Sequence, residues 1–527
     1  MELTRRNFLR FGSAGALAVA GAGMVACSPS GIATQEEGAL PEFDIPGRPS
    51  MSEIEASSVI IDELTADAEE TYDVVVVGAG TSGIPAAISA AQNGASVCVL
   101  QKEATPVAQG ATVAYINKSV TDDLGISHLV HTMREILCFR SKWDLNALWA
   151  RNCTEAVEWI TGLLLDAGLT EKDMLPLPGA TYEYPEGVAD IKVYAFPRLG
   201  GIGGVIEMLA ESYADLMTIK YSTPAVQLIK EGDKVVGVFA EQEDGSILRV
   251  NANKGIVLAT GDYQNNDAMV KKYVPDAVPY ACKQNNKTGD GHLMGMLVGA
   301  KMQNIGHSKM IHSSNASGTA HDFQSTAFLA VNKNGERFCA EDLKFTVRNN
   351  IVLDQPDHAW ISILDSKDPM PLEELEEPNK LGGLELLEGL TEADGVFKAD
   401  TIEELAEAMG LPVDTTVATV ERYNELCAGE GDVDFGKPTK FMQSVDLPPY
   451  YGLYKEYQVA ALTSGLEINA DAQVLSTEGA PIEGLYAIGN CSGPFYACPD
   501  YPMDIPALSV SRCMTFGYMV GKQLATA

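Results

Sequence analysis

The clearest pattern of hydrophobic and polar positions lies in residues 71–102, which read TYDVVVVGAGTSGIPAAISAAQNGASVCVLQK. The valine-rich run Tyr72–Val77 is typical of a strand buried on both faces. The alanine-rich run Ile84–Gln92 predicts a helix, and Ala95–Leu100 predicts a second strand. The pattern therefore predicts a strand, a tight glycine turn, a helix and a strand in succession.

Alternation of helices and strands continues beyond this unit. The periodicity predicts helices within residues 128–168, 203–216 and 292–299, and strands within residues 220–230, 234–239, 247–250 and 255–261. Strands that alternate with helices in this way predict an α/β fold with a largely parallel sheet.

The first residues match an export signal. Thr4–Leu9 reads TRRNFL, a twin-arginine pattern, and a weakly apolar run rich in glycine and alanine follows it. We therefore expect residues 1–26 to be a signal peptide, with an arginine pair before an ordinary N-terminal helix as the alternative. MVAC at residues 24–27 resembles a lipoprotein cleavage box, so we expect an extracytoplasmic protein anchored to the membrane through Cys27. Residues 27–70, rich in proline and acid, are expected to form a tether.

Charge and cysteine content exclude several kinds of site. The chain carries 37 basic and 72 acidic residues, a net charge of −35, which argues against nucleic acid or an anionic membrane surface as a partner. None of the ten cysteines forms C-x-x-C or C-x-x-C-H, so no c-type haem, simple iron–sulfur cluster or zinc motif is predicted. Cys491 and Cys498 are close enough in sequence to pair.

The glycine turn carries the first chemical signal. Gly78, Gly80 and Gly83 form G-x-G-x-x-G between the first predicted strand and helix. In this pattern the glycines permit the sharp turn, the approach of a pyrophosphate and close helix packing, while the helix N-terminus attracts the phosphates. The second strand is followed by Gln101, where an acidic residue usually holds the ribose. The turn predicts a dinucleotide site, with the ribose held by an uncharged side chain.

Segments along most of the chain resemble one family. They are VVVVGAGTSGIPAAISAAQNGASV (residues 74–97), ATG (259–261), TGDGHLMGMLVGA (288–300), VNKNGERF (331–338), ADTIEELAEAMGL (399–411), ATVERYN (418–424), LPPYY (447–451), GLEINADAQVL (465–475) and GLYAIGN (484–490). In this order they resemble the fumarate reductase/succinate dehydrogenase flavoprotein superfamily, especially its exported reductases and the related 3-ketosteroid dehydrogenases. The resemblance implies a Rossmann-like FAD-binding domain of glutathione-reductase type at 71–308 and 456–527. It also implies an inserted α+β capping domain at 309–455.

The resemblance implies the cofactor and its contacts. The cofactor is expected to be FAD, bound non-covalently because Ala104 stands where membrane-bound members have the histidine that bonds to the flavin. The residues expected to contact FAD are Gly78, Ala79, Gly80, Thr81, Ser82, Gly83, Gln101, Lys102, Gly110, Ala111, Thr112, Ala225, Val226, Thr260, Gly261, Asp290, Gly489, Asn490, Leu508 and Ser509.

The substrate site departs from the fumarate-reducing members of that family. In those members one arginine protonates the substrate and a second arginine relays the proton to it. Counting from the asparagine of the VNKNGERF segment places Phe345 at the first position and Gln324 at the second. Arg348 lies three residues after Phe345. Residues 459–466 lack the usual histidine, and residues 499–506 lack the usual second arginine. Without these carboxylate-binding groups, fumarate itself is not the expected substrate.

Two tyrosines are the candidate catalytic residues. Tyr501-Pro502 is similar to the Tyr-Pro of ketosteroid dehydrogenases, and Tyr115 lies near a tyrosine position of that branch. A phenol can polarise a carbonyl or deliver a proton to a developing enolate. A buried structural phenol is the alternative for Tyr115, and for Tyr501 we favour the catalytic role.

The sequence thus predicts an exported FAD-dependent oxidoreductase that reduces an activated C=C bond of an enone or a conjugated aromatic or steroid-like compound. Electrons are expected from a separate donor, such as a cytochrome or a quinol-linked flavoprotein, in anaerobic respiration. The alternatives are a ketosteroid-type dehydrogenase working in the oxidative direction and a non-catalytic surface flavoprotein that carries electrons. The sequence names neither the substrate nor the oligomeric state.

Overall fold

A computed structural model describes residues 64–304, 306–314, 328–343, 345–367 and 395–526. The expected signal peptide, Cys27, most of the expected tether and Gln324 lie outside these residues. The chain forms two compact units. The first runs up to Val274 and then takes in Gln284–Ser308 and Leu462 to the C-terminus, and the second comprises Pro275–Lys283 and Lys309–Ala461.

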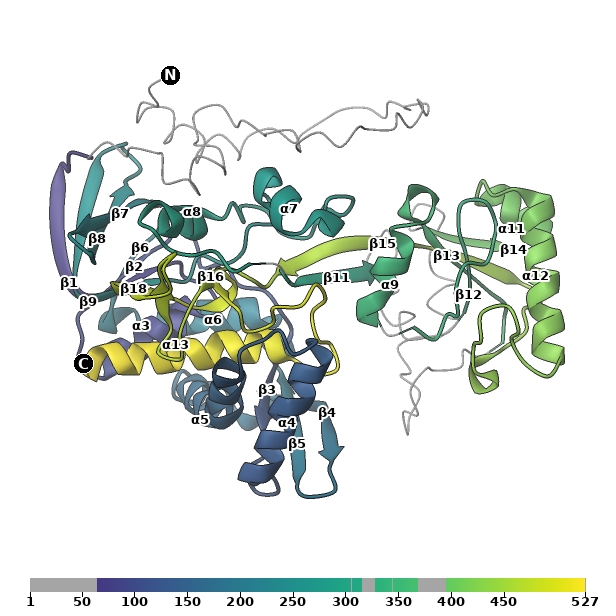
Figure 1. Ribbon diagram of the computed structural model, residues 1–527, viewed down its shortest axis with the longest axis horizontal. Coiled ribbons are helices and arrows are strands. Elements are labelled where there is room, and N and C mark those ends of the chain that lie inside the picture. Colours follow the sequence, from purple (N-terminus) through teal and green to yellow (C-terminus); the bar gives the residue numbers. More distant parts are fainter. Residues whose placement is uncertain (1–63, 305, 315–327, 344, 368–394, 527) are drawn as a thin grey trace. The chain divides into compact units, whose positions relative to one another are not determined.

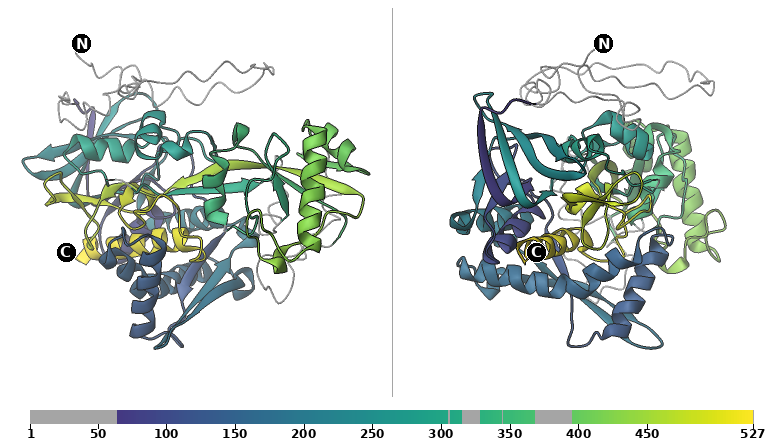
Figure 2. Two further views of the ribbon diagram at one scale, coloured as in Figure 1. Left: turned by 45° about the vertical axis from the view of Figure 1, so that its right-hand side comes forward. Right: turned by 60° about the vertical axis from the view of Figure 1, so that its left-hand side comes forward.

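The first unit is built on an eight-stranded mixed sheet. Its strands are β1 (Ala68–Val77), β2 (Val97–Leu100), β6 (Thr218–Lys220), β7 (Ala225–Glu231), β8 (Lys234–Glu241), β9 (Ile247–Leu258), β17 (Gln473–Leu475) and β18 (Pro481–Ala487). The central strands β18, β9, β1, β2 and β6 are parallel neighbours in that order. β7, β8 and β9 form an antiparallel meander, and β17 pairs antiparallel with β18. The long strands β1 and β9 lie side by side (Figure 1, Figure 2).

The helices of this unit are α3 (Gly83–Gln92), α4 (Asp123–Ile136), α5 (Trp143–Asp166), α6 (Ile202–Ser212), α7 (Asp267–Tyr273), α8 (Asp290–Leu297) and α13 (Leu508–Thr526). α13, the yellow C-terminal helix in Figure 1, packs against α3. Two glycines one turn apart on α13 permit this contact. A Cβ on Gly517 would lie 2.4 Å from the carbonyl oxygen of Ser82, and one on Gly521 would lie 2.2 Å from that of Ala86. The C-terminal helix therefore reaches the backbone that follows the glycine turn.

Smaller sheets complete the first unit. β3 (Thr112–Ile116), β5 (Val188–Ala195) and β4 (Leu175–Glu183) form an antiparallel sheet in that order, and β16 (Leu466–Glu467) pairs with β19 (Ser492–Gly493). No helix among the described residues is long and apolar enough to cross a membrane.

The second unit holds a six-stranded sheet made of β10 (Ala281–Cys282), β11 (Lys309–Ser314), β12 (Leu329–Val331), β13 (Trp360–Leu364), β14 (Val396–Ala399) and β15 (Tyr450–Leu462). Its helices are α9 (Phe345–Val352), α11 (Ile402–Ala408) and α12 (Val413–Ala428). A buried ionic network supports this unit. Arg337 lies 2.8 Å from Glu341 and 2.7 Å from Asp432, and Lys437 lies 3.1 Å from Glu341. Two cations and two anions balance each other, so the burial of these charges is compensated.

Candidate functional site

The turn between β1 and α3 has room only for glycine at its key positions. Gly78 has a φ of 110°, and a Cβ on it would lie 2.5 Å from the carbonyl oxygen of Ala259. A Cβ on Gly83 would lie 1.8 Å from the carbonyl oxygen of Gly78. Ser82 forms no side-chain cap on α3, and the first turn of that helix has no acidic residue. Ile84 N–H already donates to the carbonyl oxygen of Gly80 at 3.2 Å and Pro85 has no N–H, so the N–H groups of Ser82 and Gly83 are the ones that remain open to an anion.

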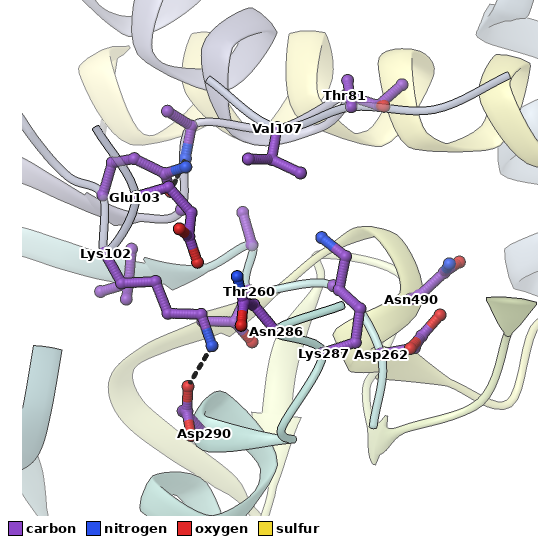
Figure 3. Close-up of a pocket in the computed structure, with 18 of the residues that line it drawn as sticks. Thr81, Lys102, Glu103, Val107, Thr260, Asp262, Asn286, Lys287, Asp290 and Asn490 are labelled. Atoms are coloured by element: carbon purple, nitrogen blue, oxygen red, sulfur yellow. Dashed lines mark hydrogen bonds and ion pairs between the residues drawn. The ribbon is translucent and has the colours of Figure 1, made fainter. Parts of the chain in front are cut away.

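A cavity of about 350 Å³ opens at this turn (Figure 3). The residues that the sequence predicted for the cofactor and that line this cavity are Gly78, Ala79, Gly80, Thr81, Ser82, Gln101, Lys102, Ala225, Thr260, Gly261, Asp290 and Asn490. They come from the ends of β1, β2 and β9, from the start of β7 and α8, and from the segment after β18. Twelve positions spread over more than four hundred residues of sequence therefore face one space.

Eight of the expected cofactor residues do not line the cavity: Gly83, Gly110, Ala111, Thr112, Val226, Gly489, Leu508 and Ser509. Gly83 begins α3. Val226 belongs to a buried apolar cluster with Leu64 and Phe239. Gly489 lies against Ser82, whose Oγ is 2.6 Å from the position of a Cβ on that glycine.

Gln101 uses its side-chain amide within the protein. Its Oε1 accepts the backbone N–H of Ala79 at 3.2 Å, and its Nε2 donates to the carbonyl oxygen of Thr105 at 2.8 Å. The residue is 5% exposed. An amide can accept and donate at once, whereas a carboxylate only accepts, so this geometry explains a glutamine at the end of β2.

Lys102 and Asp290 form an ion pair at one side of the cavity (Figure 3). Lys102 Nζ lies 2.9 Å from Asp290 Oδ2 and donates to Thr288 Oγ1 at 2.9 Å. The N-cap of α8 is Gly289, so Asp290 lies in the first turn of the helix. The pair joins the end of β2 to the start of α8.

Several residues that line the cavity were not predicted from the sequence. They include Glu103, Val107, Asp262, Lys287 and Cys513. Lys287 directly precedes the T-G-D-G segment, which was the one signal that could have indicated it. Burial raises the pKa of Asp262, whose carboxylate accepts backbone N–H groups of Gln264 and Leu462 at 3.1 Å each.

Neither candidate catalytic tyrosine is among the residues that line this cavity; Tyr501 lies in the loop before α13, and Tyr115 lies on β3. Tyr501 is 4% exposed, and its hydroxyl oxygen accepts the backbone N–H of Ser509 at 2.7 Å. Burial, and then the neighbouring Tyr496, raise the pKa of Tyr501 well above its usual range. Tyr115 on β3 donates its hydroxyl hydrogen to Tyr194 on β5 at 3.2 Å. Burial and this bond raise the pKa of Tyr115, so both phenols stay protonated at neutral pH.

Comparison with known families identifies the site. A family model described as "FAD binding domain" matches residues 73–497. The chain belongs to this FAD binding domain family. The match covers the glycine turn and nearly all of the cavity, so the expected FAD cofactor agrees with the family.

Curated relatives of this family member include both reductases and dehydrogenases. The chain is 26% identical to an NADH:fumarate oxidoreductase of Klebsiella pneumoniae over 87% of its own length, and spans about half of that relative (48%). It is 27% identical to a vinyl phenol reductase of Lactiplantibacillus plantarum, with 88% of this chain and 98% of the relative covered.

Solved structures confirm the expected α/β fold with its capping domain. The open conformation of a flavocytochrome c3 fumarate reductase matches with a TM-score of 0.68 and 22% identity, over 87% of this chain and 79% of that one. A 3-ketosteroid Δ1-dehydrogenase from Sterolibacterium denitrificans matches with a TM-score of 0.67 and 19% identity, over 86% and 99%. The expected resemblance to both branches is therefore confirmed.

The cavity of this structure suits a dinucleotide. Asn490 Oδ1, which lines it, has no hydrogen-bond partner among the described residues, and Thr260 Oγ1 has only the weakly polar thiol of Cys491 as a neighbour. Buried polar atoms of this kind need a partner, which the polar groups of a dinucleotide supply. The glycine turn adds open N–H groups for its phosphates.

Proposed function

We propose that this FAD family member reduces an activated C=C bond of an organic acceptor, such as an enone or a conjugated aromatic or steroid-like compound. The observation that carries the proposal is the cavity where the glycine turn, the Lys102–Asp290 pair and Asn490 meet, in a chain whose relatives include several reductases. Gly78–Ser82, Thr260, Gly261 and Asn490 would hold the cofactor. When bound, FAD supplies hydride transfer.

We assign the proton transfer to the buried Tyr501 and the partly buried Tyr115. The Tyr501 oxygen accepts the Ser509 N–H, so its own hydrogen is left for another acceptor, which is the neighbouring Tyr496 hydroxyl until a substrate binds. A raised pKa keeps that hydrogen in place until a stronger base develops, as it does on the carbon next to the one that gains a hydride. Tyr501 would deliver the proton, and Tyr115 would bind the polar end of the substrate.

We further propose that the flavin is held without a covalent bond. Ala104 lines the cavity, and its methyl group offers no atom for attachment. Acid precipitation of the purified protein tests this point, because a non-covalent flavin stays in the supernatant. Flavin that remains on the precipitated chain would contradict the proposal.

We also propose that the protein is exported and anchored to the membrane, and that a separate redox protein donates its electrons. The twin-arginine sequence and Cys27 support export and a lipid anchor. Substituting both Arg5 and Arg6 by lysine should leave the protein in the cytoplasm, as fractionation would show. A protein that still reaches the cell envelope would refute the export route.

The decisive experiment uses the purified protein with its flavin reduced chemically under anaerobic conditions. Enones, cinnamates, urocanate and steroids are then added one at a time, and flavin absorbance reports reoxidation. Fast reoxidation by one class, with the saturated product found by mass spectrometry, supports the proposal. If no compound reoxidises the flavin, the proposed reductase function is refuted, and the result favours the alternative of a non-catalytic flavoprotein that carries electrons.

The oxidative direction is the second candidate. The Tyr501-Pro502 loop and the fold shared with the ketosteroid dehydrogenase favour it. Adding saturated ketosteroids to the oxidised protein, with an artificial electron acceptor, separates the two directions. If the protein oxidises a saturated ketosteroid faster than any unsaturated compound reoxidises the reduced flavin, the result would favour the dehydrogenase.

A further inference from the structure

Lys287 reaches into the cavity from the wall opposite the glycine turn. It precedes α8, and its side chain passes over Gly261, where a Cβ would lie 3.6 Å from the lysine Nζ. Figure 3 shows the ammonium group pointing across the cavity, toward the wall that carries Thr81 and Val107. Thr81 belongs to the glycine turn, so the cation and the start of α3 face the same space.

The two lysines of the cavity have different surroundings. The ammonium of Lys102 is bound by Asp290 and Thr288. That of Lys287 makes no hydrogen bond or ion pair within the part of the chain that the structure describes. Burial and the charge of Lys102 lower the pKa of Lys287, while Asp262 and Glu103 act in the opposite direction. Lys287 is therefore a half-buried cation whose charge is only partly compensated.

The wall of the cavity that faces Lys287, formed by the glycine turn and the start of α3, also carries positive charge. The N-terminus of α3 carries partial positive charge, and it has neither a capping side chain nor an acidic residue in its first turn. Two positive groups thus face one cavity, which is unfavourable until an anion lies between them. A diphosphate has the charge and the size to contact both.

We propose that Lys287 binds the diphosphate of the dinucleotide from the side opposite the glycine turn, and so makes the cavity selective for nucleoside diphosphates over uncharged nucleosides. This inference rests on the FAD site described above. Lys102 does not have this role, because its charge is already neutralised by the ion pair with Asp290.

The test measures binding to protein from which the flavin has been removed. ADP carries the diphosphate without the flavin, adenosine lacks the diphosphate, and FAD is the whole cofactor. In Lys287→Met, which keeps the apolar stem, we expect the dissociation constants of ADP and FAD to rise about ten- to hundred-fold, and that of adenosine to stay unchanged. Lys287→Arg should restore most of the loss. The effect should shrink only modestly at high salt, since a half-buried charge is screened less than an exposed one.

Protein stability and a control variant distinguish a binding role of Lys287 from a purely structural one. We expect Lys287→Met to be at least as stable as the parent protein without nucleotide, because the substitution removes a poorly compensated cation. Lys234→Met is the matched control, since Lys234 pairs with Glu483 away from the cavity and should change neither ADP nor FAD binding. Unchanged ADP and FAD affinity in Lys287→Met, or an equal loss for adenosine, overturns the inference. The reoxidation assay is not involved, so the proposed reductase function stands or falls separately.

Discussion

The hydroxyl oxygen of Tyr501 accepts the backbone N–H of Ser509 at 2.7 Å. Ser509 lies in the first turn of α13, so this bond joins the loop around Tyr501 to the helix that packs on α3. The same loop is bound from the other side, because Tyr182 donates its hydroxyl hydrogen to the carbonyl oxygen of Asp504. The Tyr501 oxygen is thus an acceptor beside the phenol of Tyr496, whereas the Tyr182 hydroxyl is a donor to the loop.

The first prediction concerns Tyr501→Phe. Reoxidation of the reduced flavin by the acceptor should slow by about 10²–10⁴-fold, the usual contribution of a general acid. Stability should fall by only about 1 kcal/mol, because one partly buried N–H loses its acceptor. Stopped-flow absorbance and denaturant unfolding measure the two effects.

Tyr182→Phe is the control for this variant, since it also removes a hydrogen bond to the loop. It should lower stability by a similar amount and leave the reoxidation rate close to that of the parent protein. Equal rate losses in the two variants would show that Tyr501 acts through loop structure and not as the acid.

The second prediction concerns Gln101. Gln101→Glu keeps an acceptor for Ala79 N–H but places a carboxylate against the carbonyl oxygen of Thr105. We expect the flavin-free protein to lose about 1–3 kcal/mol, because a buried charge then lacks a donor. Gln101→Met, which loses both bonds without adding charge, should lose less. Denaturant unfolding of the flavin-free variants decides, and a Glu variant as stable as the parent would refute the explanation given for the glutamine.

The third prediction compares two glycines in helices. Gly83→Ala places a methyl group 1.8 Å from the carbonyl oxygen of Gly78, so the turn must move and FAD should be lost from the purified protein. Gly162→Ala, within α5, meets nothing within 4 Å and should raise stability by about 0.4–1 kcal/mol. Flavin absorbance and thermal unfolding provide the measurements. Full flavin content in Gly83→Ala would contradict the close packing of α3 on the turn.

The fourth prediction concerns Cys138 and Cys498. Both are free thiols, and after burial the neighbouring Cys138 contributes to the raised pKa of the Cys498 thiol, whereas the sequence showed only that Cys491 is close enough to Cys498 to pair. A disulfide reagent such as oxidised glutathione should join Cys138 to Cys498 by thiol–disulfide exchange and be released as two thiols. Peptide mapping should find this link and none between Cys491 and Cys498. Cys138→Ser should abolish it, and oxidised protein in which both thiols stay free would contradict the prediction.

Much of the fold follows from local sequence. The first predicted strand, helix and strand appear as β1, α3 and β2 with small shifts at their ends, because valine runs and alanine-rich periodicity act over a few residues. The strands predicted separately at residues 247–250 and 255–261 form one strand, β9, which ends at Leu258. Polar Asn251 interrupts the apolar pattern there, but its side chain donates to Glu69 on β1, and the strand continues because it pairs along its length with β1.

The sequence by itself determined the glycine turn, the α/β fold and the FAD family, because these depend on backbone conformation and on motifs that are contiguous in the chain. Only the tertiary structure decided what each polar group of the site does. Gln101 is used to hold Ala79 and Thr105, Lys102 is paired with Asp290, and Lys287 is left facing the turn. Such assignments depend on segments nearly two hundred residues apart that the sheet brings together, and hydrogen bonds and charges act over a few ångströms in space whatever the separation in sequence.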